Sequence, residues 1–181
     1  MPPDYVLSNA DVALLALLCE ERMHAWKLEK VVEYRDTRFW TDLSQSTIYK
    51  QLRALEKAGL VESVQEVSDG RMRKVYSITP SGRTALVSRL RELLSEPEHL
   101  KWRVDLGTYN LSLLPKKQAL SCLKAYRAKL LENIEDYRRL EEFMKSVGCS
   151  AVRLAVSRRP VYLLEAETRW LDDFSKELQK N

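Results

Sequence analysis

Cysteine, histidine and glycine are scarce in this chain, and each scarcity argues against a class of function. The 181 residues include three cysteines, two histidines and five glycines. The cysteines are odd in number, widely spaced and without a Cys-x-x-Cys pair, which argues against a disulfide framework or a zinc site. No phosphate-binding loop, glycine-rich dinucleotide turn, His-x-x-x-His pair or Gly-x-Ser-x-Gly elbow is present. We therefore expect no enzyme, no metal and no cofactor.

Long hydrophobic runs are also missing. The longest, residues 12–19, is far too short to cross a bilayer. The N-terminus has an acid before its apolar stretch and no basic leader, unlike a secretion signal, so we expect a cytoplasmic protein. The chain is 45% hydrophobic and 31% charged with a net charge of +4. This composition is typical of an ordered, helix-rich chain, and its mild basicity permits a nucleic-acid partner without requiring one.

The most informative stretch is residues 41–79. Ser44 or Ser46 can cap the start of a helix, and Gly59 can end it in the left-handed conformation. One face of this helix carries an apolar stripe at helical spacing, made of Ile48, Leu52 and Leu55. The opposite face is polar and cationic, with Ser46, Lys50, Arg53 and Lys57. This pattern predicts a helix that packs on one side and meets an anionic partner on the other.

Two short segments rich in valine, isoleucine and tyrosine follow, at residues 60–67 and 74–79. A Ser-Asp-Gly sequence separates them, and Asp-Gly is a strong signal for a hairpin turn. An amphipathic helix alone is usually just a solvated face, and a hairpin alone is common. Their order, with cations beside the turn, instead favours a winged helix-turn-helix that binds duplex DNA.

The contacts with DNA can be assigned by position along this motif. The N-terminal end of the recognition helix is the part that enters the major groove, so its side chains are expected to touch base edges. The cations further along the helix and beside the wing turn are expected to hold the phosphate backbone or the minor groove. The expected DNA-binding residues are Gln45, Ser46, Thr47, Tyr49, Lys50, Arg53, Lys57, Arg71, Arg73 and Lys74.

Two helices are expected before the recognition helix, at about residues 10–21 and 24–35, and they complete a three-helix core. His24 is expected to act as a cap or buried hydrogen-bonding group rather than as a metal ligand, because no second ligand is nearby. Thr79 and Pro80 begin a further helix, as cap and first residue. We place a domain boundary at its end, which gives a winged helix-turn-helix domain at 1–96 and a helical domain at 97–181.

The helical domain is expected to contain a short helix within residues 100–111 and a long one at 115–146. The last helix begins near Ala151 and bends at Pro160, or it begins at Pro160. Apolar residues recur every seven positions in both long helices, which resembles a coiled-coil seam. An antiparallel pair has too little interior for both stripes, so we expect a two-fold dimer; the alternative is that the helices fold back on the winged domain. The expected dimerisation residues are Leu123, Leu130, Ile134, Tyr137, Met144, Leu164, Trp170, Leu171, Phe174 and Leu178.

Aromatic side chains suggest a place for a small effector. A ligand that binds one arrangement of the winged domains better than another could regulate DNA binding. Plain packing in a core or interface is the alternative for each tryptophan. The candidate pocket residues are Trp26, Trp40, Trp102, Tyr109 and Trp170.

These motifs resemble the PadR family of bacterial and archaeal transcriptional regulators. The specific part is the Ser-x-x-Tyr-x-x-Leu-x-x-Leu-Glu-x-x-Gly-Leu-Val pattern at residues 46–61, followed by RMRKVYSITPSG at 71–82. The segment LLALLCEERMHAWKLEKVVE and a looser ending around Glu165, Glu167, Trp170 and Leu171 extend the likeness over nearly the whole chain. The family often has His-Gly-Tyr where this chain has His24-Ala25-Trp26, which removes a hydroxyl from that position.

The resemblance implies a mainly α protein with a small β-hairpin wing, acting as a dimeric repressor of transcription. Many family members respond to small aromatic or drug-like effectors. A MarR-like regulator shares the basic wing, but that family has dimerisation helices before the winged domain as well, and only about eight residues precede the first helix here. A winged helix used only for protein–protein interaction is the remaining alternative.

Overall fold

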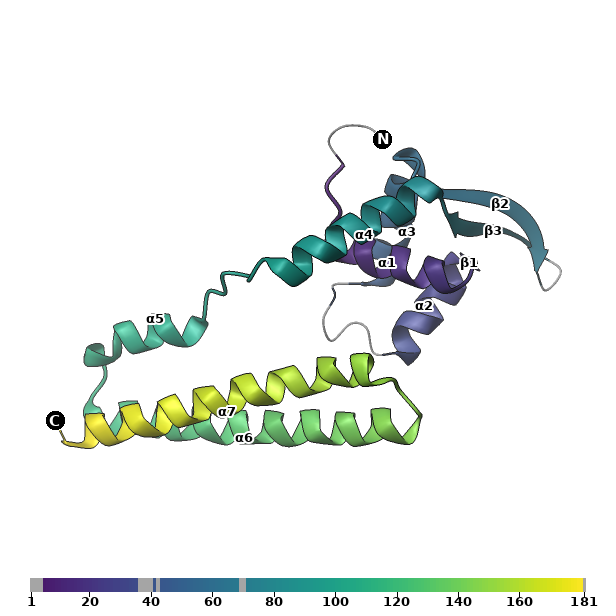
Figure 1. The fold of residues 1–181 in the computed structure, drawn as a ribbon. Coiled ribbons are helices and arrows are strands. Elements are labelled where there is room, and N and C mark those ends of the chain that lie inside the picture. Colours follow the sequence, from purple (N-terminus) through teal and green to yellow (C-terminus); the bar gives the residue numbers. More distant parts are fainter. Residues whose placement is uncertain (1–4, 36–40, 42, 69–70, 181) are drawn as a thin grey trace. The chain divides into compact units, whose positions relative to one another are not determined.

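The computed structural model describes residues 5–35, 41, 43–68 and 71–180, and it divides into two compact units, residues 1–99 and 100–181 (Figure 1). The first unit carries the winged helix-turn-helix and the second is entirely helical. The elements of the first unit are α1 (Asn9–Glu20), β1 (Met23–His24), α2 (Ala25–Tyr34), α3 (Gln45–Lys57), β2 (Val61–Ser68), β3 (Arg71–Ile78) and α4 (Pro80–Ser95).

Side-chain caps fix where the helices of the first unit begin. Ser8 and Asp11 form a reciprocal capping box at α1. The Ser44 hydroxyl accepts the amide of Thr47 at the start of α3, which decides between the two caps that the sequence allowed. Thr79 caps α4 and Pro80 is its first residue, as predicted. His24 caps α2 by accepting the amide of Lys27, so its predicted role as a cap is confirmed.

The hairpin is longer than predicted, and a third strand joins it. Strands β2 and β3 pair antiparallel from Val61 with Ile78 to Ser68 with Arg71. The two-residue strand β1 pairs with the other edge of β3, which gives the order β1-β3-β2. The predicted Asp-Gly turn lies outside the described residues.

The core of the first unit lies where α1, α2 and α3 meet beneath the sheet. The α3 stripe is fully buried, and Leu14, Leu28 and Val32 come from the two preceding helices. Gly59 ends α3 at a φ of +73°. Gly82, in the first turn of α4, lets that helix approach the chain after α3, since a Cβ there would lie 2.0 Å from the carbonyl oxygen of Leu60. These packed elements hold the outer face of α3 and the wing on one rigid scaffold.

The second unit is built on two long helices that run antiparallel. Its elements are α5 (Arg103–Tyr109), the 3-10 turn η2 (Leu111–Leu113), α6 (Lys116–Ser146) and α7 (Ala151–Lys180). The last helix begins at Ala151 and contains Pro160, which is the first of the two alternatives. No helix in the described part of the chain is long and apolar enough to span a membrane.

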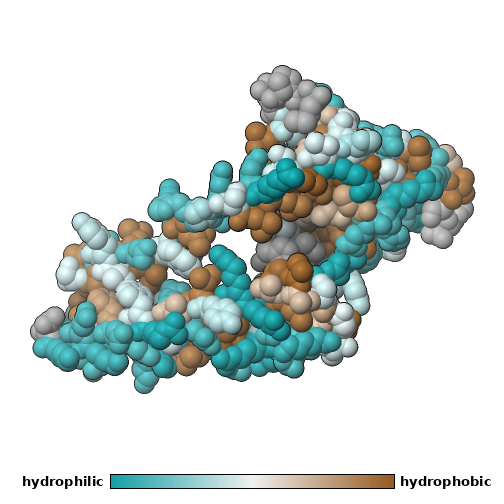
Figure 2. Space-filling view, viewed as in Figure 1, coloured by the Kyte–Doolittle hydropathy of each residue, from teal (hydrophilic) through white to brown (hydrophobic). Residues whose placement is uncertain are grey.

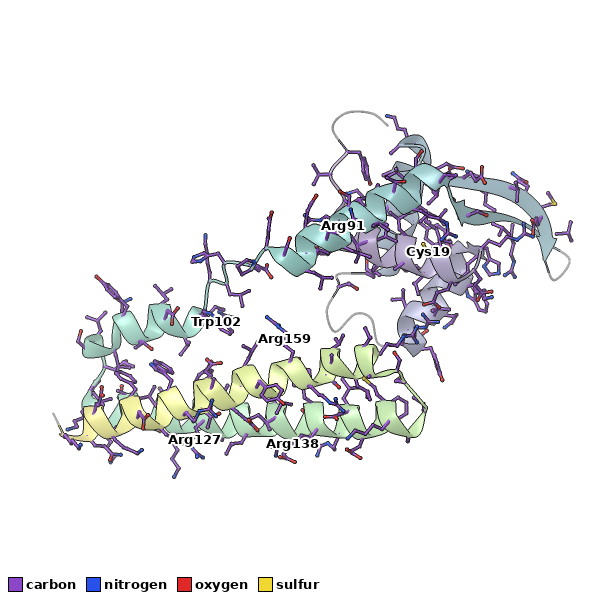
Figure 3. All side chains as sticks on the ribbon, viewed as in Figure 1. Cys19, Arg91, Trp102, Arg127, Arg138 and Arg159 are labelled. Carbon is purple, nitrogen blue, oxygen red and sulfur yellow. The ribbon has the colours of Figure 1, made fainter. Side chains whose placement is uncertain are left out.

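The α6–α7 pair is held by an apolar seam and by polar contacts on either side of it. Arg127 forms a bidentate ion pair with Asp172, with the shorter contact 2.6 Å long, and Arg138 reaches Glu165 (Figure 3). The Tyr126 hydroxyl donates to Glu167, and burial together with this carboxylate raises the pKa of Tyr126 to about 12. These contacts set the register of the two helices.

The seam changes the interpretation of the expected dimer interface. Leu123, Leu130, Ile134 and Leu171 are all buried within one chain, the two leucines of α6 against Leu171 of α7. Side chains that are buried inside one chain in this way cannot also contact a second chain. The seven-residue repeat does mark a helix-packing seam, but Leu123, Leu130 and Leu171 find their packing partners within the same chain. Any interface between chains must use other faces.

Candidate nucleic-acid interface

The outer face of α3 presents its cations to solvent. Lys50, Arg53 and Lys57 are exposed, while the apolar stripe on the other side of the helix is wholly buried. Tyr49 is 40% exposed beside them. The predicted division of this helix into a buried apolar face and an exposed cationic face is therefore confirmed.

The N-terminal end of α3 is already engaged in local hydrogen bonds. The Ser44 hydroxyl lies 2.9 Å from that of Ser46 and 2.7 Å from that of Thr47. The side-chain amide of Gln45 donates through Nε2 to a carboxylate oxygen of Glu29 of α2 at 3.0 Å. A base edge would have to compete with these partners, each of which lies in an exposed and easily hydrated position.

One cation of the wing is tied to α3. Lys74 donates to both carboxylate oxygens of Glu56, at 3.0 and 2.8 Å, and Ser63 donates to the same carboxylate. The hydrogen bonds from Lys74 and Ser63 lower the pKa of Glu56, and the bond to Glu56 raises the pKa of Lys74. Both directions favour the ion pair, which clamps β3 onto the recognition helix and neutralises one wing charge.

The second cation of the wing is held by the start of α2. Arg73 NH1 lies 3.1 Å from His24 Nε2, and its guanidinium carbon lies 5.8 Å from the centre of the Trp26 ring. The third cation, Arg71, begins β3, but its side chain lies outside the described residues.

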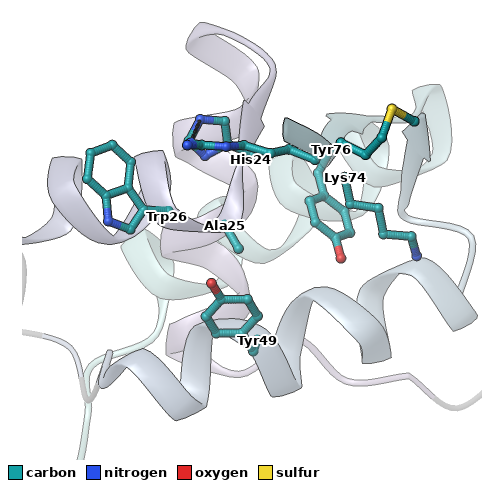
Figure 4. Close-up of a pocket in the computed structure, with 8 residues that line it drawn as sticks. His24, Ala25, Trp26, Tyr49, Lys74 and Tyr76 are labelled. Carbon is teal, nitrogen blue, oxygen red and sulfur yellow. Dashed lines mark hydrogen bonds between the residues drawn. The ribbon is translucent and has the colours of Figure 1, made fainter. Parts of the chain in front are cut away.

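These side chains surround a hollow of about 560 Å³ between α3, the start of α2 and β3 (Figure 4). Two cations and three aromatic rings line it, and no carboxylate is among the lining residues that the structure describes. The lining residues are His24, Ala25, Trp26, Tyr49, Met72, Arg73, Lys74 and Tyr76.

Five of these lining residues were not among the predicted DNA-binding residues: His24, Ala25, Trp26, Met72 and Tyr76. His24 was expected as a cap or a buried hydrogen-bonding group, Trp26 as part of an effector pocket, and Tyr76 had no predicted role. Neither His24 nor Tyr76 carries a local signal, because His24 meets Arg73 across 49 positions of sequence and Tyr76 joins the hollow through the pairing of β3. The arrangement depends on the sheet, which local patterns describe poorly.

The aromatic residues proposed for an effector pocket fall in both units. Trp26 lines the hollow in the first unit and is 53% exposed. Trp102, Tyr109 and Trp170 belong to the second unit, and Trp170 stacks on Phe174 with ring centres 5.6 Å apart. Trp40 lies outside the described residues. Within the described chain, no group of three or more histidine, cysteine or acidic side chains could hold a metal ion.

Comparison with known proteins gives one family. Residues 14–88 match the model described as the transcriptional regulator PadR-like family. The transcriptional regulator Rv3488 of Mycobacterium tuberculosis is 49% identical over 51 residues, which are 28% of this chain and 48% of that protein. The chain thus matches about half the length of that relative.

Solved structures share the whole fold. Bacillus subtilis PadR in complex with operator DNA superimposes with a TM-score of 0.76 at 19% identity, over 96% of this chain and 99% of that one. The same protein in complex with p-coumaric acid gives a TM-score of 0.72 at 18% identity, over 93% and 98%. At this identity the likeness concerns the fold, and it confirms the expected winged helix-turn-helix followed by long helices.

Proposed function

We propose that this chain, whose residues 14–88 form a PadR-like transcriptional regulator domain, is a dimeric regulator that binds duplex DNA and represses transcription. The observation that carries the proposal is the exposed cationic face of α3, set beside a basic wing on one rigid scaffold. A surface of this shape and charge fits the major groove and the flanking phosphates of a double helix. We also propose that the protein acts in the cytoplasm, where a bacterial or archaeal chromosome is accessible to it.

The residues divide into two kinds of contact. Lys50, Arg53 and Lys57 on α3, with Arg71 and Arg73 on the wing, neutralise phosphates and supply most of the affinity. Lys74 lies at the same surface and adds its charge only when it is released from Glu56. Gln45, Ser46 and Thr47 sit at the end of α3 that enters the groove and read base edges. Tyr49 gives its hydroxyl to a phosphate.

A dimer would read a pseudo-palindrome, and the second unit has surface suited to making one. Val156, Leu163 and Trp170 recur every seven residues on α7 and all remain exposed. Exposed apolar side chains also cluster on α5 and the turn that follows it, at Leu106, Tyr109 and Leu113 (Figure 2). Exposed hydrophobic patches of this kind are typical of interaction surfaces. The outer face of α7 with α5 is therefore our choice for the two-fold interface.

Relief of repression would need a ligand that favours one separation of the two winged domains. The aromatic residues of the second unit, Trp102, Tyr109 and Trp170, offer a surface for a small aromatic effector. The complex of Bacillus subtilis PadR with p-coumaric acid supports this class of ligand.

Charge reversal on α3 tests the proposal. Binding of a random-sequence duplex of about three helical turns is followed by fluorescence anisotropy for wild type and for the double variant Lys50→Glu, Arg53→Glu. We expect affinity to fall at least about 100-fold, because two phosphate contacts become repulsive. The control is Arg91→Glu, Lys101→Glu, which makes the same change of net charge at exposed positions outside α3 and the wing. Equal losses in the two variants would refute the assigned face.

A further inference from the structure

The two faces of the β2–β3 hairpin differ in charge. Side chains alternate between the faces along each strand, and the pairing from Val61 to Ser68 is continuous. Both acids of β2, Glu62 and Glu66, therefore lie on the face turned away from α3. The face turned toward α3 carries Lys74, which binds Glu56 of that helix, and within the described strands Lys74 is its only charged residue. A polyanion lying against α3 would meet no carboxylate of the hairpin.

An exposed apolar pair lies on this acid-free face, beyond Lys74. Val67 and Met72 are directly opposite each other in the strand pairing, so their side chains share one face. Met72 lies two residues from Lys74, about 7 Å further along the strand, and it lines the hollow beside Tyr49 of α3. Val67 is 71% exposed and Met72 is 61% exposed. Side chains this exposed add little to the core of the first unit and are open to a partner.

The charges around the pair favour DNA as that partner. Lys50, Arg53 and Lys57 are exposed on α3, on the side of the domain that this hairpin face adjoins. A second copy of the same surface would bring like charges together, which opposes self-association here. Duplex DNA instead offers phosphates to the helix and apolar deoxyribose to the wing. Proteins that bind the minor groove commonly place apolar side chains in it.

We propose that Val67 and Met72 enter the minor groove next to the major groove that α3 occupies, with Val67 against deoxyribose and Met72 reaching the base edges. This inference rests on the proposed function and gives the wing a part in sequence preference. The unbranched side chain of methionine is long enough and flexible enough for this reach. A G·C pair carries an amino donor in the minor groove that an A·T pair lacks. An apolar group over that donor removes its water without replacing the hydrogen bond, so Met72 should disfavour G·C pairs there.

The test compares two duplexes that differ only in the minor groove. One contains guanine, and the other has inosine at every guanine, which removes the amino group and leaves the major-groove edge unchanged. Anisotropy with the full-length wild type should show at least about fivefold tighter binding of the inosine duplex. Met72→Ala should bind the two duplexes equally, and Met72→Leu should keep the preference. A preference that survives in Met72→Ala would overturn the assigned role.

The double variant Val67→Thr, Met72→Ala measures what the pair contributes to affinity. Binding of the inosine duplex should fall about tenfold, because apolar contact is lost. The slope of log affinity against log salt should stay the same, since no charge changes. Val64→Thr is the matched control, because Val64 is 48% exposed on the opposite face of the same strand and should bind as wild type does. The thermal midpoint of each variant checks folding.

The outcomes distinguish this inference from the function beneath it. If wild type binds duplex with a steep salt slope but the double variant binds both duplexes as wild type does, the pair lies outside the DNA. The inference is then wrong and the proposed function stands. If the double variant loses the same affinity on both duplexes and keeps the inosine preference, the pair touches DNA outside the minor groove, and the inference is again wrong. If wild type binds no duplex, the proposed function fails and the inference falls with it.

Discussion

Among single residues, Glu56 controls how much positive charge the wing offers to DNA. Its carboxylate holds Lys74 and Ser63, so it joins β3 to α3 while neutralising one cation on the surface that faces the partner. Glu56 is therefore expected to stabilise the fold while weakening the affinity for DNA. The ion pair is partly exposed, so its contribution to the free energy of folding is small.

Replacing Glu56 by glutamine should tighten DNA binding. Lys74 of each chain then becomes available to a phosphate, and the slope of log affinity against log salt should steepen by about 1.8 for the dimer. Glu62→Gln is the matched control, since Glu62 is an exposed acid on β2 whose side chain points to the opposite face from Ser63. A similar gain in both variants would mean that net charge, not Lys74, is responsible.

The same ion pair predicts a response to acid. The pKa of Glu56 is lowered in the folded chain, so its stabilising contribution is complete above the ordinary glutamate value of about 4.3 and is lost as the pH falls through the lowered value. We expect the thermal midpoint of wild type to exceed that of Glu56→Gln at pH 7 and the difference to shrink below about pH 4. A difference that stays constant from pH 7 to pH 3 would rule out the ion pair as its origin.

Among the elements, the end of α3 and the start of α4 each depend on a glycine, for two different reasons. Gly59 needs its positive φ but has open space around its Cα, whereas Gly82 has no room for a Cβ. Gly59→Ala should cost about 1–2 kcal/mol of unfolding free energy from backbone strain alone. Gly82→Ala should cost more, because the backbone at Leu60 must move.

Chemical denaturation measures both changes, with Gly107→Ala as the control. Gly107 lies inside α5 with nothing within 4 Å of a built Cβ, so alanine there should be neutral or stabilising for that helix. The fit between α3 and α4 would be contradicted if Gly82→Ala were the milder of the two glycine variants in the first unit.

Local signals predicted these elements well, and contacts distant in sequence were harder to foresee. Local signals of a few adjacent residues mark the helix starts at Ser44 and Thr79 and the helix end at Gly59. The positions of α3 and α4 could therefore be predicted from sequence. Strand β1 could not, because two residues form a strand only when β3 is beside them. The contact between His24 and Arg73 depends on that same pairing. Part of the candidate site was therefore invisible before the fold was known.

The long helices show a second limit. A repeat of seven residues indicates a helix-packing seam but says nothing about whether the partner helix belongs to the same chain. In α6, Leu130 faces α7 and is 3% exposed, while its neighbour Leu131 is 41% exposed. The structure shows that the partner helix of Leu130 belongs to the same chain, which the seven-residue repeat alone could not tell.

For the molecule as a whole, substitutions on the exposed face of α7 should break the dimer, whereas a substitution in the buried seam should destabilise the fold. Leu163→Glu with Trp170→Glu should give folded monomers by light scattering, since both side chains lie on the exposed face of α7. Leu130→Glu should instead lower the free energy of unfolding by at least about 3 kcal/mol, because it buries a charge in the seam. Leu131→Glu should do neither. A dimer that survives the double change on α7 would move the interface to another surface.

The central claim is that an exposed cationic helix and wing bind duplex DNA, and the salt dependence of wild-type binding tests it most directly. Anisotropy of a labelled duplex is recorded over a range of salt concentrations. With Lys50, Arg53, Lys57, Arg71 and Arg73 engaged in each of two chains, the slope of log affinity against log salt should be about −9. A slope near zero, or no binding at the lowest salt concentration, would contradict the account.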